Sequence, residues 1–394
     1  MPRTARQLAA LGALAGLVLF AVSANIVFAA LLRMSATFAV AASDLATASA
    51  VQFAGVVLSC VVGGIVADRA GKRSVLVVAS ALVCVGATLW ALAPGLKSVF
   101  AGAFVMGLGG GALESMSTAL MADLFPGRRR LVLNLSQVAY CVGAVGGPAA
   151  MGWLLPLGVP WRLFFVGTAV GGLLVCLVFL AVSPGTGQTA PLRDEGVAAC
   201  PRLGLAVWVP CMAIFCYVTA ETGTATFATV YLANAKAAPE RWAVLALALF
   251  WGMMMVGRLL CALLPEDHPH ERVIAALLVL GAGCSAAHLA GLPWEGDVCL
   301  FALTGLAFAG TWPLIIGLAT ARHPQHTGTV VGLATGLGSI GAIAAAPLLR
   351  PLISGTRPAT AFALAAALLA FAAAVILLPS PAAEPAEAPH DHPA

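Results

Sequence analysis

Two glutamates stand alone in the middle of long apolar segments. Glu114 lies in the apolar run 98–125, and Glu221 lies in the run 203–234. An ionisable side chain deep in such a segment is costly, and it usually marks a solute path or a proton carrier. Either carboxyl could instead hydrogen-bond a neighbouring hydroxyl and hold two helices together. We predict that both glutamates bind a solute or couple its movement to protons.

Amides, hydroxyls and aromatic rings accompany the glutamates. Residues three or four apart share a helix face, so Tyr217 and Thr224 are expected beside Glu221. The side chains that we predict to bind a solute are Asn25, Asn134, Gln137, Tyr217, Thr224 and Trp312. Such groups donate and accept hydrogen bonds and offer flat apolar faces, which suits a sugar-like solute. Core packing remains the alternative for Trp312, and an interhelical hydrogen bond remains the alternative for Asn25.

The composition indicates a membrane protein. Of the 394 residues 61% are apolar and 9% are charged, whereas soluble domains carry roughly a quarter charged residues. A helix that crosses a bilayer needs about 20 apolar residues. We predict an all-α fold of twelve transmembrane helices at 7–33, 44–68, 74–93, 98–125, 131–156, 161–183, 203–234, 242–264, 273–291, 298–321, 329–353 and 359–378. Strands are disfavoured because the runs do not alternate; a bundle with one re-entrant run is the alternative.

The predicted helices form two six-helix halves. The first half spans 1–183, a cytoplasmic linker spans 184–202, the second half spans 203–378, and a disordered cytoplasmic tail spans 379–394. The stretch from Gly107 to Glu114 has a counterpart from Gly305 to Trp312, and the glycines of 143–146 have counterparts in 338–341. Repeats of this kind place the solute site near the membrane midplane, between the halves.

Basic residues predict the orientation. The clusters at 69–73 and 128–130 fall on the same side as both termini, so both termini are expected in the cytoplasm and the protein in the cell (inner) membrane. The first run far exceeds the 7–15 residues of a signal-peptide core and is expected to be retained. We find no phosphate-binding loop, metal-ligand spacing or catalytic triad. The sequence therefore predicts no enzyme, cofactor or metal, and a transporter driven by a gradient.

The segment 63–73, GGIVADRAGKR, lies between the second and third runs. It resembles the loop motif of the major facilitator superfamily. An acid and several cations at helix ends can form ion pairs that close one conformational state, although the cations could also serve topology. The resemblance implies a conformational-gating loop made of Gly64, Asp68, Arg69, Gly71, Lys72 and Arg73.

Three further segments narrow the resemblance. The stretches 107–115 (GLGGGALES), 133–137 (LNLSQ) and 217–222 (YVTAET) are similar to the fucose/glucose/galactose proton-symporter family. This resemblance implies the two-half major facilitator fold, alternating access, a sugar substrate and a monomer. Where the family places an acid in the first helix, this sequence has Phe28. The family's usual pair of coupling acids is therefore not expected here.

Three functions remain in competition. The first is a transporter of a sugar-like polar solute, with proton coupling left open; its partners would be the solute, protons and the lipid bilayer, and no nucleic acid. The second is a proton-driven exporter of amphipathic or drug-like compounds, suggested by Phe28 and by the methionines at 253–255. The third is a sensor that binds a solute without moving it, although its signalling segment is missing. Arg258 is expected to be a structural cation that bonds loop groups or lipid phosphate.

Overall fold

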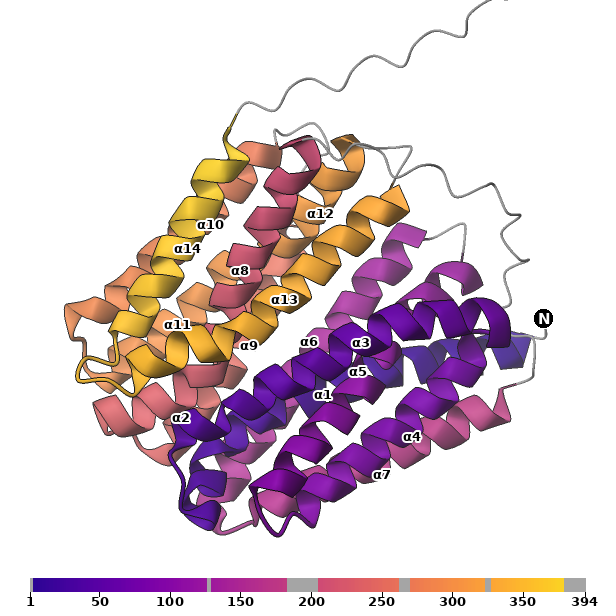
Figure 1. Cartoon of the computed structure of the whole chain (residues 1–394), viewed down its shortest axis with the longest axis horizontal. Helices are drawn as coiled ribbons and strands as arrows, with labels where there is room; N and C mark the ends of the chain where they lie inside the picture. Colours follow the sequence, from indigo (N-terminus) through magenta and orange to yellow (C-terminus); the bar gives the residue numbers. More distant parts are fainter. Residues whose placement is uncertain (1–2, 126–128, 183–204, 262–269, 323–326, 379–394) are drawn as a thin grey trace, which may run out of the picture.

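The computed structural model describes residues 3–125, 129–182, 205–261, 270–322 and 327–378. Every regular element in these ranges is a helix, as predicted (Figure 1). The predicted linker 184–202 and tail 379–394 lie outside the described residues.

Six long helices of the N-terminal half coincide with the first six predicted runs. The elements are α1 (Arg3–Phe38), the short α2 (Ala42–Leu45), α3 (Thr47–Ala70), α4 (Lys72–Ala91), α5 (Leu96–Leu124), α6 (Arg129–Leu154), the 3-10 turn η2 (Leu155–Leu157) and α7 (Trp161–Ala181). Their continuous apolar sequence lets each helix satisfy its backbone hydrogen bonds internally, which a bilayer requires.

The C-terminal half follows the same order with local changes. Its elements are α8 (Leu205–Val230), the π-helix η3 (Tyr231–Ala235), α9 (Glu240–Cys261), α10 (His270–Ala287), the 3-10 turn η4 (His288–Ala290), α11 (Trp294–Phe308), α12 (Thr311–Arg322), α13 (Thr327–Ile353) and α14 (Thr360–Ile376). The predicted single helix 298–321 is wrong in one respect, because α11 and α12 divide it. Pro313 cannot donate to the carbonyl of Ala309, and its ring crowds that carbonyl.

Ten stretches of the described residues are long and apolar enough to cross a membrane. The other two predicted spans correspond to α8 and α14. The α8 helix carries Glu221 and several buried threonines, and α14 is 17 residues long.

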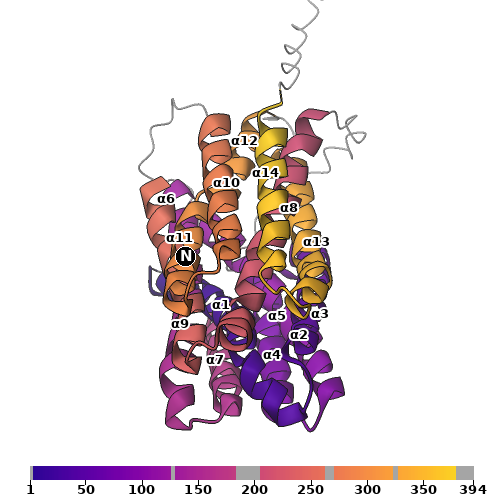
Figure 2. The same ribbon diagram turned by 90° about the vertical axis from the view of Figure 1, so that its left-hand side faces the viewer.

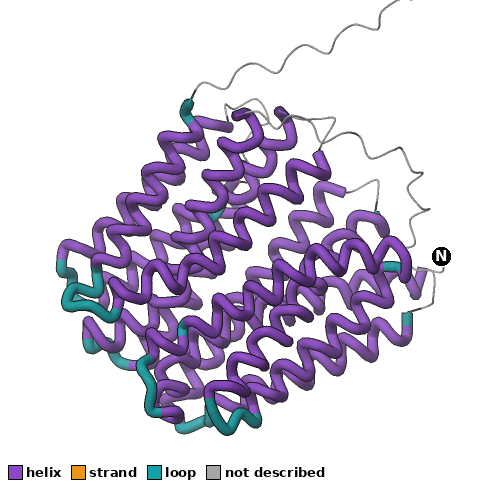
Figure 3. Tube along the Cα trace, in the orientation of Figure 1, coloured by secondary structure: helices purple, strands orange, loops and turns teal. Residues whose placement is uncertain are grey.

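The two halves lie side by side and pack through α3 against α13 and α6 against α9 (Figures 1 and 2). Most of the described turns lie at the end of the bundle opposite the N-terminus (Figure 3). We call this the far end; it contains Phe38, Leu92, Gly158, Gly291 and Gly355.

Two ion pairs join the halves at the far end. Arg33 at the end of α1 pairs with Glu240 at the start of α9. Asp44 of α2 pairs with Arg350 of α13 at 2.6 Å. Arg33 also donates to the carbonyl of Leu155 at 3.1 Å. Charges that belong to different halves therefore meet at the far end.

Close helix crossings confirm the internal repeat. A Cβ atom on Gly107 would collide with the carbonyl of Gln52, and one on Gly305 would collide with the carbonyl of Phe250. The glycines are 305 − 107 = 198 residues apart, and so are their partners, 250 − 52 = 198. A Cβ atom on Gly143 would likewise collide with the carbonyl of Val18, and one on Gly341 with the carbonyl of Phe215. The structural counterpart of Gly143 is therefore Gly341, and not Gly338, at which the matched segment 338–341 begins.

Candidate functional site

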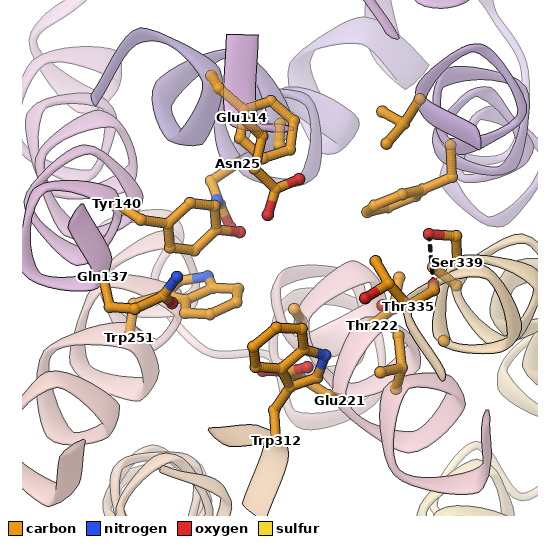
Figure 4. Close-up of a pocket in the computed structure, with 18 of the residues that line it drawn as sticks. Asn25, Glu114, Gln137, Tyr140, Glu221, Thr222, Trp251, Trp312, Thr335 and Ser339 are labelled. Atoms are coloured by element: carbon orange, nitrogen blue, oxygen red, sulfur yellow. Dashed lines mark hydrogen bonds between the residues drawn. The ribbon is translucent and has the colours of Figure 1, made fainter. Parts of the chain in front are cut away.

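One cavity of about 150 Å³ lies between the two halves (Figure 4). Its walls come from α1, α3, α5 and α6 of one half and from α8, α9, α12 and α13 of the other. Because one buried water needs roughly 10–15 Å³ of such space, the cavity has room for a solute of about ten non-hydrogen atoms.

The cavity wall follows the internal repeat. Six pairs of lining residues are each separated by 198 positions, as in 312 − 114 = 198: Phe20 and Val218, Ala24 and Thr222, Phe53 and Trp251, Glu114 and Trp312, Gln137 and Thr335, and Tyr140 and Gly338. The same spacing relates the charged lining residues to uncharged counterparts: Glu114 to Trp312, Glu221 to Ser23, and Arg258 to Cys60. None of the three charges therefore has a charged equivalent in the other half.

Both predicted glutamates line this cavity. Glu114 comes from α5 and Glu221 from α8, and both face the central space (Figure 4). The carboxylate of Glu114 makes no hydrogen bond or ion pair with a described residue. Ser115 beside it is already occupied, because its hydroxyl donates to the carbonyl of Gly111 at 2.8 Å. The structure therefore leaves Glu114 available to a solute or a proton.

Three of the predicted polar or aromatic residues also reach the cavity. Asn25 donates to the carbonyl of Ala21 at 2.9 Å, while its side-chain oxygen is buried without a partner in the described structure. Gln137 comes from α6 of one half and Trp312 from α12 of the other, and both line the cavity (Figure 4). An unpaired buried acceptor costs free energy unless a ligand or water satisfies it. Asn25 is thus prepared to accept a hydrogen bond from a solute.

Three other predicted residues are placed differently. Tyr217 is fully buried and its hydroxyl donates to the carbonyl of Phe308 at 3.0 Å, so it is not on the cavity wall. Thr224 is buried within the C-terminal half and does not line the cavity. Asn134 lies on α6, but its side chain is outside the described part of the chain.

Arg258 is the functional candidate that the sequence reading missed. The expectation of a structural cation near loops or lipid is wrong, because Arg258 lines the cavity. Its guanidinium donates to the side-chain oxygen of Gln137 and contacts the sulfur of Cys141, both at 3.4 Å. It also interacts electrostatically with Glu114 and Glu221. The available signal was its charge within the apolar run 242–264, since an ionisable residue inside such a run usually has a functional role.

Aromatic side chains complete the wall. The ring centroids of Phe20 and Tyr140 are 5.8 Å apart, as are those of Tyr140 and Trp251. Phe28, which replaces the first-helix acid of the resembled family, lines the same cavity. The cavity-lining residues that the sequence did not predict are therefore mainly apolar.

The described cations of the predicted gating loop, Lys72 and Arg73, bond within their own half in this conformation. Lys72 pairs with Asp123 of α5. Arg73 donates to the carbonyls of Phe179 at 2.9 Å and Leu180 at 2.8 Å. Gly71 has a φ of 79°, which favours glycine and permits the expected sharp turn. Gly64, Asp68 and Arg69 lie on α3, but their side chains are outside the described part of the chain.

Comparison with known proteins places these observations in a family. Residues 12–346 match the model of the Major Facilitator Superfamily. The multidrug resistance protein MdtL of Escherichia coli strain K12 is 30% identical over 164 residues, which cover 41% of this chain and 42% of that protein. The chain therefore matches less than half the length of these curated relatives.

Two solved structures share the fold at low sequence identity. A D-xylose-proton symporter superposes with a TM-score of 0.78 at 15% identity, covering 95% of this chain and 98% of that one. The inward-open xylose transporter XylE from E. coli gives a TM-score of 0.75 at 16% identity, covering 93% and 94%. With a family match over most of its length, two repeated halves and a cavity between them, the chain belongs to the Major Facilitator Superfamily.

Proposed function

We propose that the protein is a secondary transporter that moves a small hydroxylated solute, such as a monosaccharide, by alternating access. The observation that carries the proposal is a cavity between the halves that both of them line with hydrogen-bonding groups and aromatic rings, and that contains both buried glutamates. If the halves rock about this cavity, the same groups face first one side of the bilayer and then the other.

The cavity suits a solute with several hydroxyls. Asn25, Gln137 and Glu114 offer acceptors, and Arg258 offers donors. The rings of Trp312, Trp251 and Tyr140 offer apolar faces against which the C–H groups of a sugar ring can pack.

The charges of the cavity support coupling to protons. With Glu114 and Glu221 ionised and Arg258 protonated, the three groups carry a net charge of −1, as two negative charges and one positive charge give. One proton on Glu114 would make the set neutral, which lowers the cost of holding it in the membrane interior. We therefore assign Glu114 as the proton carrier, with Glu221 as a binding group for the solute.

The ion pairs support one particular conformation. The far end is closed by Arg33 with Glu240 and by Asp44 with Arg350, while Lys72 of the gating loop bonds within its own half. With both termini in the cytoplasm, as the basic clusters suggest, the structure represents an inward-facing state of a transporter in the inner membrane. We expect the unit of function to be the monomer.

Uptake by the purified protein in proteoliposomes tests the proposal. Labelled hexoses should accumulate when a proton gradient is imposed, and excess unlabelled solute should compete. Absence of uptake for every hexose and pentose tried would reject the sugar assignment. Uptake that ignores the gradient would reject proton coupling alone.

A second function is export of amphipathic compounds. The partial likeness to MdtL and the six aromatic rings of the cavity, at Phe20, Phe28, Phe53, Tyr140, Trp251 and Trp312, favour it. Overexpression should then raise the resistance of a pump-deficient host to lipophilic compounds, and Glu114→Gln should abolish that resistance. Equal growth with the wild-type and the variant protein would count against export.

A further inference from the structure

A buried polar cluster lies at the far end of the C-terminal half, away from the cavity. Asp297, in the first turn of α11, has one carboxylate oxygen 2.6 Å from Nδ1 of His288 and the other 2.9 Å from Nζ of Lys236. Asp297 is 0% exposed and His288 is 1% exposed. A carboxylate is therefore held between an ammonium and an imidazole without contact with water.

The second ring nitrogen of His288 faces no hydrogen-bond partner in the described structure. Its Nδ1 must donate to Asp297, because an ionised carboxylate can only accept. Its Nε2 is buried and has no partner in the described structure, and its ring packs at 4.5 Å against both Phe301 and Phe362. A proton added to Nε2 would thus lack an acceptor, which is costly in a buried site.

The net charge of the cluster is zero only while His288 is neutral. Burial lowers the pKa of Lys236, but the hydrogen bond and the charge of Asp297 outweigh burial and raise it above its usual value. Lys236 and Asp297 therefore cancel each other. Of the other described residues around the imidazole, η3 contributes the neutral Tyr231, and α11 and α14 contribute Phe301 and Phe362. A protonated His288 would add a positive charge with no counter-charge.

A short segment links this cluster to the other half of the protein. Lys236 donates to the carbonyl of Leu292 at 2.7 Å, and four residues later Glu240 pairs with Arg33 of α1. Between them the backbone is tightly constrained: Ala237 has a φ of 51°. Segment 236–240 is therefore fixed to the cluster at one end and to the N-terminal half at the other.

We propose that the cluster of Lys236, Asp297 and His288 is a pH-sensitive clamp on the far end of the transporter. Protonation of His288 loosens segment 236–240, weakens the pair of Glu240 with Arg33, and lets the far end open. Imidazole is the side chain suited to such a change between pH 5 and 8. Because Tyr231 directly continues α8, the clamp also acts on the helix that carries Glu221. The proposal does not depend on the identity of the solute.

Spin-label distances across the far end test the clamp. Leu92→Cys and Thr356→Cys place labels on exposed positions of opposite halves in the full chain, with the native cysteines replaced and the protein in nanodiscs. The distance distribution should shift toward longer values as pH falls from 8 to 5. His288→Asn keeps a donor for Asp297 but cannot take up the proton, so the shift should vanish. A wild-type protein without the shift, or a variant that retains it, overturns the proposal.

Lys236→Met should reverse the direction in which the far-end distance changes on acidification. Without the ammonium, a protonated His288 would complete an ion pair with Asp297, so acidification should shorten the far-end distance. Lys97→Met is the matched control, because Lys97 is exposed at the same end and its loss should leave the wild-type pH response. A Lys236 variant that lengthens on acidification as the wild type does would show that His288 does not act through the charge balance, and would overturn the clamp.

Discussion

The guanidinium of Arg258 on α9 donates to the side-chain oxygen of Gln137 on α6, so that an amide of one half holds a charge of the other at the cavity wall. The distance of 3.4 Å is at the long limit for a hydrogen bond. Gln137 therefore binds Arg258 only weakly, and the charge of Arg258 also acts on Glu114 and Glu221.

Arg258→Lys should reduce solute transport by about tenfold or more, since an ammonium cannot reproduce the planar set of donors. Transport by the purified variant in liposomes, together with its thermal unfolding, measures the effect. Arg241→Lys on the same helix is the control, because Arg241 lies over the ring of Trp153 outside the cavity. Equal transport by the two variants would remove Arg258 from the site.

Glu114→Gln should abolish accumulation driven by a proton gradient, because the amide cannot change its charge. Exchange of labelled for unlabelled solute, which needs no net proton movement, should persist. Ser115→Ala is the neighbouring control, since its hydroxyl is bonded within its own helix. A Glu114 variant that still accumulates solute with the wild-type pH dependence would reduce that residue to a structural role.

Gly107→Ala and Gly305→Ala should each destabilise the protein by about 1–3 kcal/mol or more, because the added methyl group meets a backbone carbonyl that cannot move aside. The thermal unfolding midpoint should fall for both. Gly283→Ala, with open space around its Cβ position, should leave the midpoint unchanged or slightly raised. Unequal responses of Gly107 and Gly305 would argue against equivalent crossings.

Glu240→Gln should favour opening of the far end, since Arg33 then loses its ionised partner. Hydrogen exchange should increase in α2 and in the segment around Lys236. The exchanged pair Arg33→Glu with Glu240→Arg should restore much of the protection. If the double variant opens as far as the single one, the pair does not hold the halves together.

The helices could be predicted closely because continuous apolar runs have few alternatives in a bilayer. The break between Phe308 and Thr311 could not, since transmembrane helices tolerate proline when neighbours satisfy the freed carbonyls. The description of α10 as an unbroken helix to residue 291 likewise missed the 3-10 turn at His288–Ala290.

The polar residues of the cavity could be predicted in part from the sequence. Glu114, Glu221, Gln137 and Asn25 stand out from apolar surroundings, and the structure brings them together. Helical spacing placed Tyr217 beside Glu221, and the two side chains do interact. Spacing could not show that Tyr217 is covered by its neighbours and stays off the cavity wall. The aromatic wall could not be predicted, since nothing in a single sequence distinguishes a phenylalanine that lines a cavity from one that faces lipid.

The constant spacing of 198 residues between equivalent positions of the two halves has a consequence for their movement. From Phe20 to Tyr140 and from Val218 to Gly338 the chain uses the same number of residues to build each wall. The two halves therefore build their walls of the cavity from equal lengths of chain. In the alternating access that we propose, rotation of the two halves about the cavity would expose it to the other side of the membrane while the solute stays in place.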